Sequence, residues 1–387
     1  MKIVILVRIL WTAGAQKVAI DESKTFKDLG HDVKLVFLRK ADSGDLYFPL
    51  LNGVDWDVMA RNPRSIMTPF YDWLTGKFMP DRRGDGRLDY NLIRGFTEYI
   101  KFDRPDLIVC HDQWAGLAGY YAFRKLGINY VTILHESLGR YNLPILGTIA
   151  NSYEKLVLKN SKRVFAINEK IADSAKKMYG LETIVNYHGM DARDKLKYEE
   201  KEDLILANTT WDSNRASDLY MEILEGLPEF KMQMVGRWRD ANLKSLYKNK
   251  IIKHSLEGRI EMRENLKEEE IRVLYLRSKF MIRFGYGENG NPHGIIDSLS
   301  HGTVPILNSE LGISKIIKDF NAGIVVDNID SELIIRRIND IDNKETYSKL
   351  QKNMNKLSSE YSWVKHCNII LSSLQEKSLY QCSYRGE

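Results

Sequence analysis

Short apolar runs, most of them rich in β-branched residues, alternate with longer amphipathic segments along the whole chain of 387 residues. The runs lack the polar alternation of a half-exposed sheet, which indicates strands that are buried on both faces. Such strands belong to parallel sheets covered by helices, so the pattern predicts an α/β fold. The predicted strands are residues 2–9, 32–38, 107–110, 130–134, 163–167 and 183–187 in the first half, and 204–207, 232–235, 260–262, 280–282, 304–307 and 323–326 in the second.

The alternation restarts after Asp191, and the charged stretch 195–203 that follows is interpreted as a linker. The length suits two domains of about 150–200 residues each. We therefore predict two Rossmann-like, doubly wound domains, an N-terminal one over residues 1–190 and a C-terminal one over residues 191–360. The stretch 47–94 mixes aromatic, proline and charged residues, and it is predicted to be an insertion or a long loop beside the first domain.

The overall charge bears on whether the chain binds nucleic acid. Lys and Arg number 57 and Asp and Glu 52, which gives a formal net charge of +5. This small excess is compatible with phosphate binding but does not indicate a nucleic-acid-binding protein. The basic loop with Arg82, Arg83 and Arg87 is interpreted as a solvated loop or a peripheral contact for an anionic membrane surface. No apolar run approaches the ~18–20 residues of a membrane span.

The cysteines indicate the redox conditions in which the protein works. They are Cys110, Cys367 and Cys382. Their wide spacing and odd number favour neither a disulfide framework nor a zinc cluster, so we expect a reducing, cytoplasmic environment. The first fifteen residues imitate a signal peptide, but Arg8 interrupts the apolar run and cleavage would remove a predicted strand.

Three segments of the predicted first domain follow the carboxyl ends of strands, where parallel sheets bind ligands. Gly14 and Ala15 follow the first strand and begin a helix, so the backbone there could bind an anion. The alternative is that Gly14 is a glycine required only for packing. Only one glycine of the dinucleotide motif G-x-G-x-x-G is present, which makes an NAD site a weak interpretation. His111 and Asp112 follow strand 107–110, and His135 follows strand 130–134. A structural role for each histidine is the alternative.

The predicted second domain contains a glycine-rich loop between a strand and a helix, over residues 284–297. Glycines permit close backbone approach to a ligand, and ionised carboxylates accept hydrogen bonds from sugar and ribose hydroxyls. Arg215, between another strand and helix, could bind a phosphate or could be a solvated surface residue. The candidate residues of the loop are Glu288, Asn289, Gly290, His293, Gly294 and Asp297.

Motifs of other chemistries are weak or missing in the sequence. The D-x-D tripeptides at 55–57 and 340–342 could hold a divalent metal with a diphosphate, but neither lies at an expected strand-end crevice, so no metal site is predicted. G-x-S-x-G, P-loop, H-E-x-x-H and C-x-x-C motifs do not occur, which gives no support to serine hydrolase, P-loop kinase or zincin functions.

Taken together, the fragments resemble retaining GT-B glycosyltransferases of the family 4 type (group 1) over nearly the whole chain. The matching fragments, in order, are Gly14-Ala15-Gln16-Lys17, Leu29-Gly30-His31-Asp32-Val33, Pro105-Asp106-Leu107-Ile108 with His111, His135, His188-Gly189-Met190-Asp191, Gly236 and Tyr361-Ser362-Trp363. The resemblance implies two Rossmann-like domains that face a cleft, with a C-terminal helix over residues 361–387 that returns to the N-terminal domain.

The resemblance also implies a reaction. A sugar would pass from a nucleotide diphosphosugar, UDP- or GDP-linked, to a hydroxyl of a glycan or lipid-linked glycan with retention of configuration, without a metal or other cofactor. A nucleotide-sugar epimerase of the same fold, or a sugar-binding scaffold protein without turnover, is the alternative.

Roles for individual residues follow from the resemblance in the same way. The implied catalytic residues are His135, Arg215 and Glu288. Donor binding is implied for Gly14, Ala15, Arg215, Gly236, Glu288, Asn289, Gly290, His293, Gly294 and Asp297. His111 and Asp112 are implied on the acceptor side.

The sequence departs from the family pattern at two places. The family has a Glu-x7-Glu pair, and Asp297 matches its second acid. Counting back along the sequence places Asn289 at the first acid. A loop that differs by one residue would instead place Glu288 there, and we favour Glu288 for this position. In the family's Arg and Lys pair for the donor phosphate, Arg215 stands at the Lys position and Thr210 at the Arg position. Arg237 or Arg239 are candidates to replace the missing cation.

Overall fold

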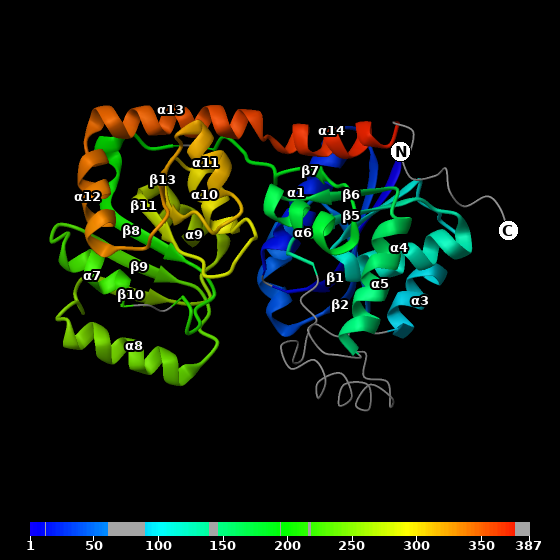
Figure 1. Ribbon diagram of the computed structural model, residues 1–387, viewed down its shortest axis with the longest axis horizontal. Helices are drawn as coiled ribbons and strands as arrows, with labels where there is room; N and C mark the ends of the chain where they lie inside the picture. Colours follow the sequence, from blue (N-terminus) through cyan, green and yellow to red (C-terminus); the bar gives the residue numbers. More distant parts are fainter. Residues whose placement is uncertain (12, 61–89, 139–145, 194, 216–217, 376–387) are drawn as a thin grey trace. The chain divides into compact units, whose positions relative to one another are not determined.

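The structure of the protein is a computed structural model that describes residues 1–11, 13–60, 90–138, 146–193, 195–215 and 218–375. The chain divides into two compact units, one made of Met1–His188 with Trp363–Glu387 and the other of Gly189–Ser362. Each unit is a parallel sheet interleaved with helices (Figure 1). Both are therefore α/β folds, as the sequence predicts. Within the described ranges, no helix combines the length and apolarity that crossing a bilayer requires.

The sheet of the first unit has the order β3-β2-β1-β4-β5-β6-β7 among the described residues, and every pairing is parallel. Its strands are β1 (Lys2–Leu10), β2 (Asp32–Lys40), β3 (Asp55–Ala60), β4 (Leu107–His111), β5 (Tyr130–Leu134), β6 (Arg163–Ala166) and β7 (Ile184–Val185). The order reverses between β1 and β4, which makes their carboxyl ends a topological switch point.

Helices connect these strands in the first unit. They are α1 (Gly14–Asp28), α3 (Tyr90–Tyr99), α4 (Gln113–Leu126), α5 (Leu146–Asn160), α6 (Glu169–Tyr179) and α14 (Trp363–Ser373), with the 3-10 segment η1 (Asp42–Leu51). Helix α1 buries Val18, Ala19 and Phe26, which recur at helical spacing. Gly30 follows the helix with a φ of 86°, the left-handed conformation that glycine adopts without strain after a helix.

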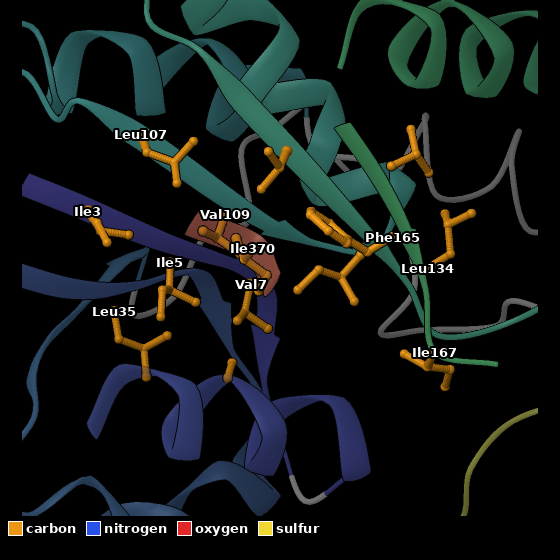
Figure 2. Close-up of a cluster of buried hydrophobic side chains, with 14 of the residues drawn as sticks. Ile3, Ile5, Val7, Leu35, Leu107, Val109, Leu134, Phe165, Ile167 and Ile370 are labelled. Atoms are coloured by element: carbon orange, nitrogen blue, oxygen red, sulfur yellow. The ribbon is translucent and has the colours of Figure 1, made fainter. Parts of the chain in front are cut away.

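The C-terminal helix α14 belongs to the first unit and packs against α1. Its Cys367 and Ile370 are fully buried in the same apolar cluster as Val109 of β4. Figure 2 shows Ile370 among side chains of β1 and β4. The predicted return of this helix is thus present over the described residues, and Cys382 lies outside them.

The region 47–94 corrects one expectation. Its first part forms η1 and the edge strand β3 rather than a loop, and its last part belongs to α3. Strand β3 pairs in parallel with β2. In the D-x-D tripeptide of this strand, Asp57 accepts a hydrogen bond from the Tyr99 hydroxyl at 2.9 Å. Residues 61–89, including the basic loop with Arg82, Arg83 and Arg87, lie outside the described residues.

The second unit has the sheet order β10-β9-β8-β11-β12-β13 among the described residues, again all parallel. Its strands are β8 (Glu202–Asn208), β9 (Lys231–Val235), β10 (Ile260–Arg263), β11 (Ser278–Arg283), β12 (Val304–Asn308) and β13 (Ile324–Val326). The order reverses between β8 and β11, as it does between β1 and β4. The two units therefore place their switch points at equivalent strands.

The helices of the second unit are α7 (Leu219–Glu225), α8 (Ala241–Lys253), α9 (Glu268–Arg277), α10 (His293–Ser300), α11 (Ser314–Phe320), α12 (Ser331–Ile341) and α13 (Lys344–Glu360). The predicted linker 195–203 is partly wrong, because it contains a short 3-10 turn, η3 (Tyr198–Glu200), and the start of β8. Lys201 in this stretch is buried, and its amine donates to the carbonyls of Leu276 and Ser278 at 2.9 and 3.0 Å. These bonds attach the stretch to the unit.

Candidate active site

In the first unit, the predicted residues Gly14, His111 and His135 lie at the carboxyl ends of neighbouring strands β1, β4 and β5. Gly14 and Ala15 form the first turn of α1, so the helix N-terminus and its unpaired N–H groups face this end of the sheet. The side chain of Gln16 donates to the carbonyl of Ile9 at 2.9 Å and ties the turn to β1.

Asp112 has a structural task at the same edge. It adopts a φ of 85° and caps α4, because its Oδ1 accepts the N–H groups of Trp114 and Ala115, each at 2.7 Å. Its other oxygen, Oδ2, lies 3.6 Å from a guanidinium nitrogen of Arg8. Aspartate is among the favoured helix N-cap residues, so this geometry alone accounts for its position.

His111 and His135 are adjacent, and they form part of a row of imidazoles. His111 Nδ1 lies 3.0 Å from His135 Nε2, and His135 Nδ1 lies 3.3 Å from His188 Nε2. Burial, followed by the neighbouring His111, lowers the pKa of His135 to about 3. His135 is therefore neutral at physiological pH, and both its ring nitrogens bond to other imidazoles.

The row continues to residues that sequence reasoning missed. The other nitrogen of His111, Nε2, lies 2.9 Å from Glu22 Oε2, and the second oxygen of Glu22 lies 2.7 Å from His366 Nε2. Glu22 is fully buried on α1, and His366 is on α14. A signal for Glu22 was present, because an acid interrupts the apolar stripe formed by Val18 and Phe26.

In the second unit, the structure brings the predicted donor residues Arg215 and Glu288 into contact. Arg215 Nε donates to Glu288 Oε1 at 2.8 Å, and its Nη2 contacts the same oxygen. The other carboxylate oxygen, Oε2, lies 2.5 Å from Nη2 of Arg283. Arg283 ends β11 and is almost fully buried. Glu288 is thus held between two guanidinium groups.

Arg283 was not singled out from the sequence, although a cation at the end of a buried strand, directly before the glycine-rich loop, is an available signal. Thr210 contributes its carbonyl, which accepts from Arg215 Nη1 at 2.8 Å. Arg239 is largely exposed and lies 3.6 Å from Asp212. Among the cations considered, Arg283 is therefore the one that shares Glu288 with Arg215.

The glycine-rich loop is attached to the next strand of the sheet. Asn308, at the end of β12, accepts from the Gly285 amide at 2.9 Å and donates to the Gly285 carbonyl at 2.7 Å. Glu310 accepts from the Gly287 amide at 2.6 Å, and the Gly290 carbonyl accepts from Gly312 at 3.0 Å. These bonds fix the loop that carries Glu288 and Asn289.

The remaining predicted donor residues surround this loop and the end of β9. His293 and Gly294 begin α10, and His293 Nδ1 lies 3.5 Å from Asp297 Oδ2 one turn later. Gly236 has a φ of 121°, and a Cβ there would lie 1.9 Å from the Thr209 carbonyl oxygen. Only glycine fits where β8 and β9 end so close together.

Two known families match the chain. The family described as Glycosyltransferase Family 4 matches residues 12–194, and the family described as Glycosyl transferases group 1 matches residues 192–359. The two matches overlap at residues 192–194 and together span residues 12–359, which includes most of both units. The chain is a GT-B glycosyltransferase.

Solved structures share the fold of this glycosyltransferase at low sequence identity. Anabaena HepE in complex with UDP and glucose has a TM-score of 0.73 and 15% identity, covering 97% of this chain and 99% of that chain. A glycosyltransferase from Rickettsia africae has a TM-score of 0.71 and 18% identity, covering 97% of both chains. Sucrose-phosphate synthase from Thermosynechococcus elongatus has a TM-score of 0.71 and 14% identity, covering 96% and 98%. No curated protein sequence matches this glycosyltransferase significantly.

Proposed function

We propose that this glycosyltransferase moves a sugar from a nucleotide diphosphosugar to a hydroxyl of a glycan or lipid-linked glycan, with retention of the anomeric configuration. The Arg215–Glu288–Arg283 cluster carries the proposal. It places two cations and one anion beside a glycine-rich loop at the switch point of a Rossmann-like sheet. Asp212 lies 3.8 Å from Arg215 and 3.6 Å from Arg239, so the three guanidinium groups and two carboxylates together leave one positive charge in excess. That excess suits a diphosphate, which guanidinium groups bind with charge-assisted hydrogen bonds.

The donor would be held by the second unit. Arg215 would bind the diphosphate, Glu288 the hydroxyls of the sugar, and Asp297 the ribose hydroxyls. The acids at 288 and 297 suit these tasks because ionised carboxylates only accept hydrogen bonds. HepE, which shares the fold, has been crystallised with UDP and with UDP-glucose, so we favour UDP over GDP as the nucleotide.

The first unit would complete the reaction. The N–H groups at Gly14 and Ala15 would stabilise charge on the leaving phosphate, as the N-terminus of a helix favours an anion. His135 would act near the donor sugar as a neutral group, since its pKa is lowered to about 3. His111 and Asp112 would border the acceptor side.

Positive charge from guanidinium groups and backbone N–H groups, rather than a metal, would neutralise the leaving diphosphate. Removing one such preorganised donor typically costs about 3 kcal/mol of transition-state stabilisation. A lipid-linked acceptor would bring the enzyme to an anionic membrane surface from the cytoplasmic side.

Two measurements test the function. Thermal unfolding of the purified protein with UDP, GDP, ADP, NAD or buffer identifies the nucleotide, because a ligand at about 100 times its dissociation constant stabilises by about 2.7 kcal/mol. Incubation with the matching nucleotide sugars and candidate acceptors then measures acceptor-dependent release of the nucleoside diphosphate. A shift with UDP and release that needs an acceptor support the proposal.

Other outcomes assign a different function. Conversion of the donor without any acceptor would mean an epimerase. Binding of a nucleotide sugar without turnover would mean a sugar-binding scaffold protein. A thermal shift with NAD alone would show that the turn at Gly14 serves a dinucleotide and would contradict the proposed donor.

A further inference from the structure

The first unit contains a row of buried ionisable groups that no step of the proposed transfer requires as a whole. Its order is His366, Glu22, His111, His135 and His188, and the nitrogen–oxygen and nitrogen–nitrogen distances between neighbours run from 2.7 to 3.3 Å. The groups come from both ends of the chain and from three strand ends or loops between them. Each ring nitrogen in the row is either a donor or an acceptor, so the partner of each nitrogen determines whether that nitrogen carries a hydrogen.

The first proton is fixed by a backbone carbonyl. His366 Nδ1 lies 2.7 Å from the carbonyl oxygen of Tyr187, which can only accept, so this nitrogen carries a hydrogen. Burial raises the pKa of Glu22, but His111 and His366 outweigh burial and the net pKa is far below its ordinary value. Glu22 is therefore a carboxylate. It accepts a second hydrogen from His366 Nε2, which makes His366 a cation paired with a buried anion.

The direction of the remaining bonds follows from the same carboxylate. Glu22 Oε2 only accepts, so His111 carries a hydrogen on Nε2. Because His366 already balances the one buried negative charge, a second buried cation would be uncompensated, so His111 has no hydrogen on Nδ1 and this nitrogen accepts from His135 Nε2. His135 is neutral, so its Nδ1 in turn accepts from His188 Nε2. The planes of the His111 and His135 rings are only 18° apart at a centroid distance of 5.2 Å, which suits an edge-to-edge hydrogen bond.

We propose that Glu22 is a positioning residue that, balanced by His366, locks His111, His135 and His188 in one tautomer, with every hydrogen on Nε2 and every bond pointing toward Glu22. Reversal of any one ring would place two donors or two acceptors face to face in a buried site, which is costly. Glu22 thereby sets the orientation and neutrality of His135, and this part rests on the proposed function of His135 near the donor sugar.

The chain offers a sharp variant pair and a matched control. Glu22→Gln retains the shape and can remain satisfied if its amide oxygen accepts from His111 and its NH₂ donates to His366. His366 must then lose its Nε2 hydrogen and become neutral, while the other three rings are unchanged. Glu22→Leu removes both bonds. Glu154, a buried acid of α5 that binds Gln113 at 2.9 Å and the Tyr179 hydroxyl, provides the same substitutions away from the row.

Ring ¹⁵N NMR of the eight histidines reports the tautomers directly, whether or not the enzyme turns over. We expect hydrogen on Nε2 of His111, His135 and His188 and on both nitrogens of His366 in the native protein. We expect His366 to become neutral in Glu22→Gln, and the tautomers of the row to mix in Glu22→Leu. Both Glu154 variants should keep the native pattern.

Activity supplies the second readout. Glu22→Leu should lower kcat by about 10- to 100-fold, the range found when the partners that orient metal-bound histidines are removed, with UDP affinity unchanged. Glu22→Gln should retain kcat, as should both Glu154 variants.

An Nδ1 hydrogen on His111, His135 or His188 in the native protein overturns the proposal, and so does a Glu22→Leu variant with native tautomers. Should Glu22→Leu not fold, a His366 that stays doubly protonated in Glu22→Gln overturns it. If tautomers follow the expectation but no transfer is ever detected, the proposed function fails and the tautomer lock stands.

Discussion

Arg283 Nη2 lies 2.5 Å from Glu288 Oε2, so a cation at the end of the buried strand β11 fixes a carboxylate in the glycine-rich loop. Burial lowers the pKa of Arg283, and Glu288 opposes this by favouring the charged guanidinium. The same carboxylate binds Arg215, which is more accessible than Arg283. Arg283 thus stabilises Glu288 from inside the unit and leaves the guanidinium of Arg215 at the edge that a diphosphate would approach.

Arg215→Ala should weaken UDP binding about 10- to 100-fold, because a hydrogen bond to a charged group is worth about 1.5–3 kcal/mol. Arg277→Ala is the matched control, since Arg277 is exposed and pairs with Glu202 at 2.5 Å, outside the cluster around Glu288. Calorimetric titration with UDP measures both. Equal affinities in the two variants would remove Arg215 from the diphosphate site.

Asp297→Ala should abolish discrimination between UDP and 2′-deoxy-UDP, if Asp297 binds the ribose hydroxyls. The native protein should prefer UDP by about tenfold, the worth of one hydrogen bond to a charged group. Asp319→Ala tests for a general effect of charge removal, as Asp319 is an exposed residue of α11 paired with Lys315 at 3.0 Å. A preference that survives in Asp297→Ala would contradict the ribose assignment.

Gly236→Ala should destabilise the second unit by about 3 kcal/mol or more, because the added Cβ would lie 1.9 Å from the Thr209 oxygen at a φ of 121°. Gly258→Ala is a suitable control, because a Cβ at that site would meet nothing within 4 Å. Urea denaturation compares the two variants. A midpoint for Gly236→Ala equal to that of Gly258→Ala would mean that the ends of β8 and β9 separate easily.

The pKa of His135 predicts a pH dependence of stability. Its folded pKa of about 3 lies below the ordinary 6.5, so between these values the unfolded chain binds a proton that the folded chain does not. The free energy of unfolding should therefore fall by about 1.4 kcal/mol per pH unit as the pH drops below 6.5. His135→Asn should lose this part of the slope between about pH 6 and pH 5 in urea denaturation. Identical slopes in the two proteins would show that His135 titrates normally.

Most of the fold was predictable from local sequence because its buried parallel strands are short, continuous apolar runs. Strand β3 was missed because it begins Asp55-Trp56-Asp57 at the edge of the sheet, where polar side chains are tolerated and the apolar run is short. The position of β3 at the sheet edge, rather than weak pairing with β2, explains why the sequence lacks the apolar run of a buried strand there.

The site was predictable only where its residues follow strand ends. Arg215 and Glu288 met this criterion, and the structure places them in contact. Glu22 and His366 are joined across 344 positions of sequence, so no local window could pair them. Each nevertheless interrupts an apolar stripe of its helix, Glu22 between Val18 and Phe26, and such an interruption signals a buried polar partner elsewhere.

The assignment of α14 to the first unit has a consequence for how the protein is made. The ribosome completes residues 189–362 before it reaches His366, Cys367 and Ile370. Until then, the first 188 residues lack the cation that balances Glu22 and the helix that covers part of their apolar cluster. Domains generally fold from the N-terminus onward during synthesis. Here the continuous second unit can finish first, and the first unit must wait for a helix that is translated after the whole of the second unit.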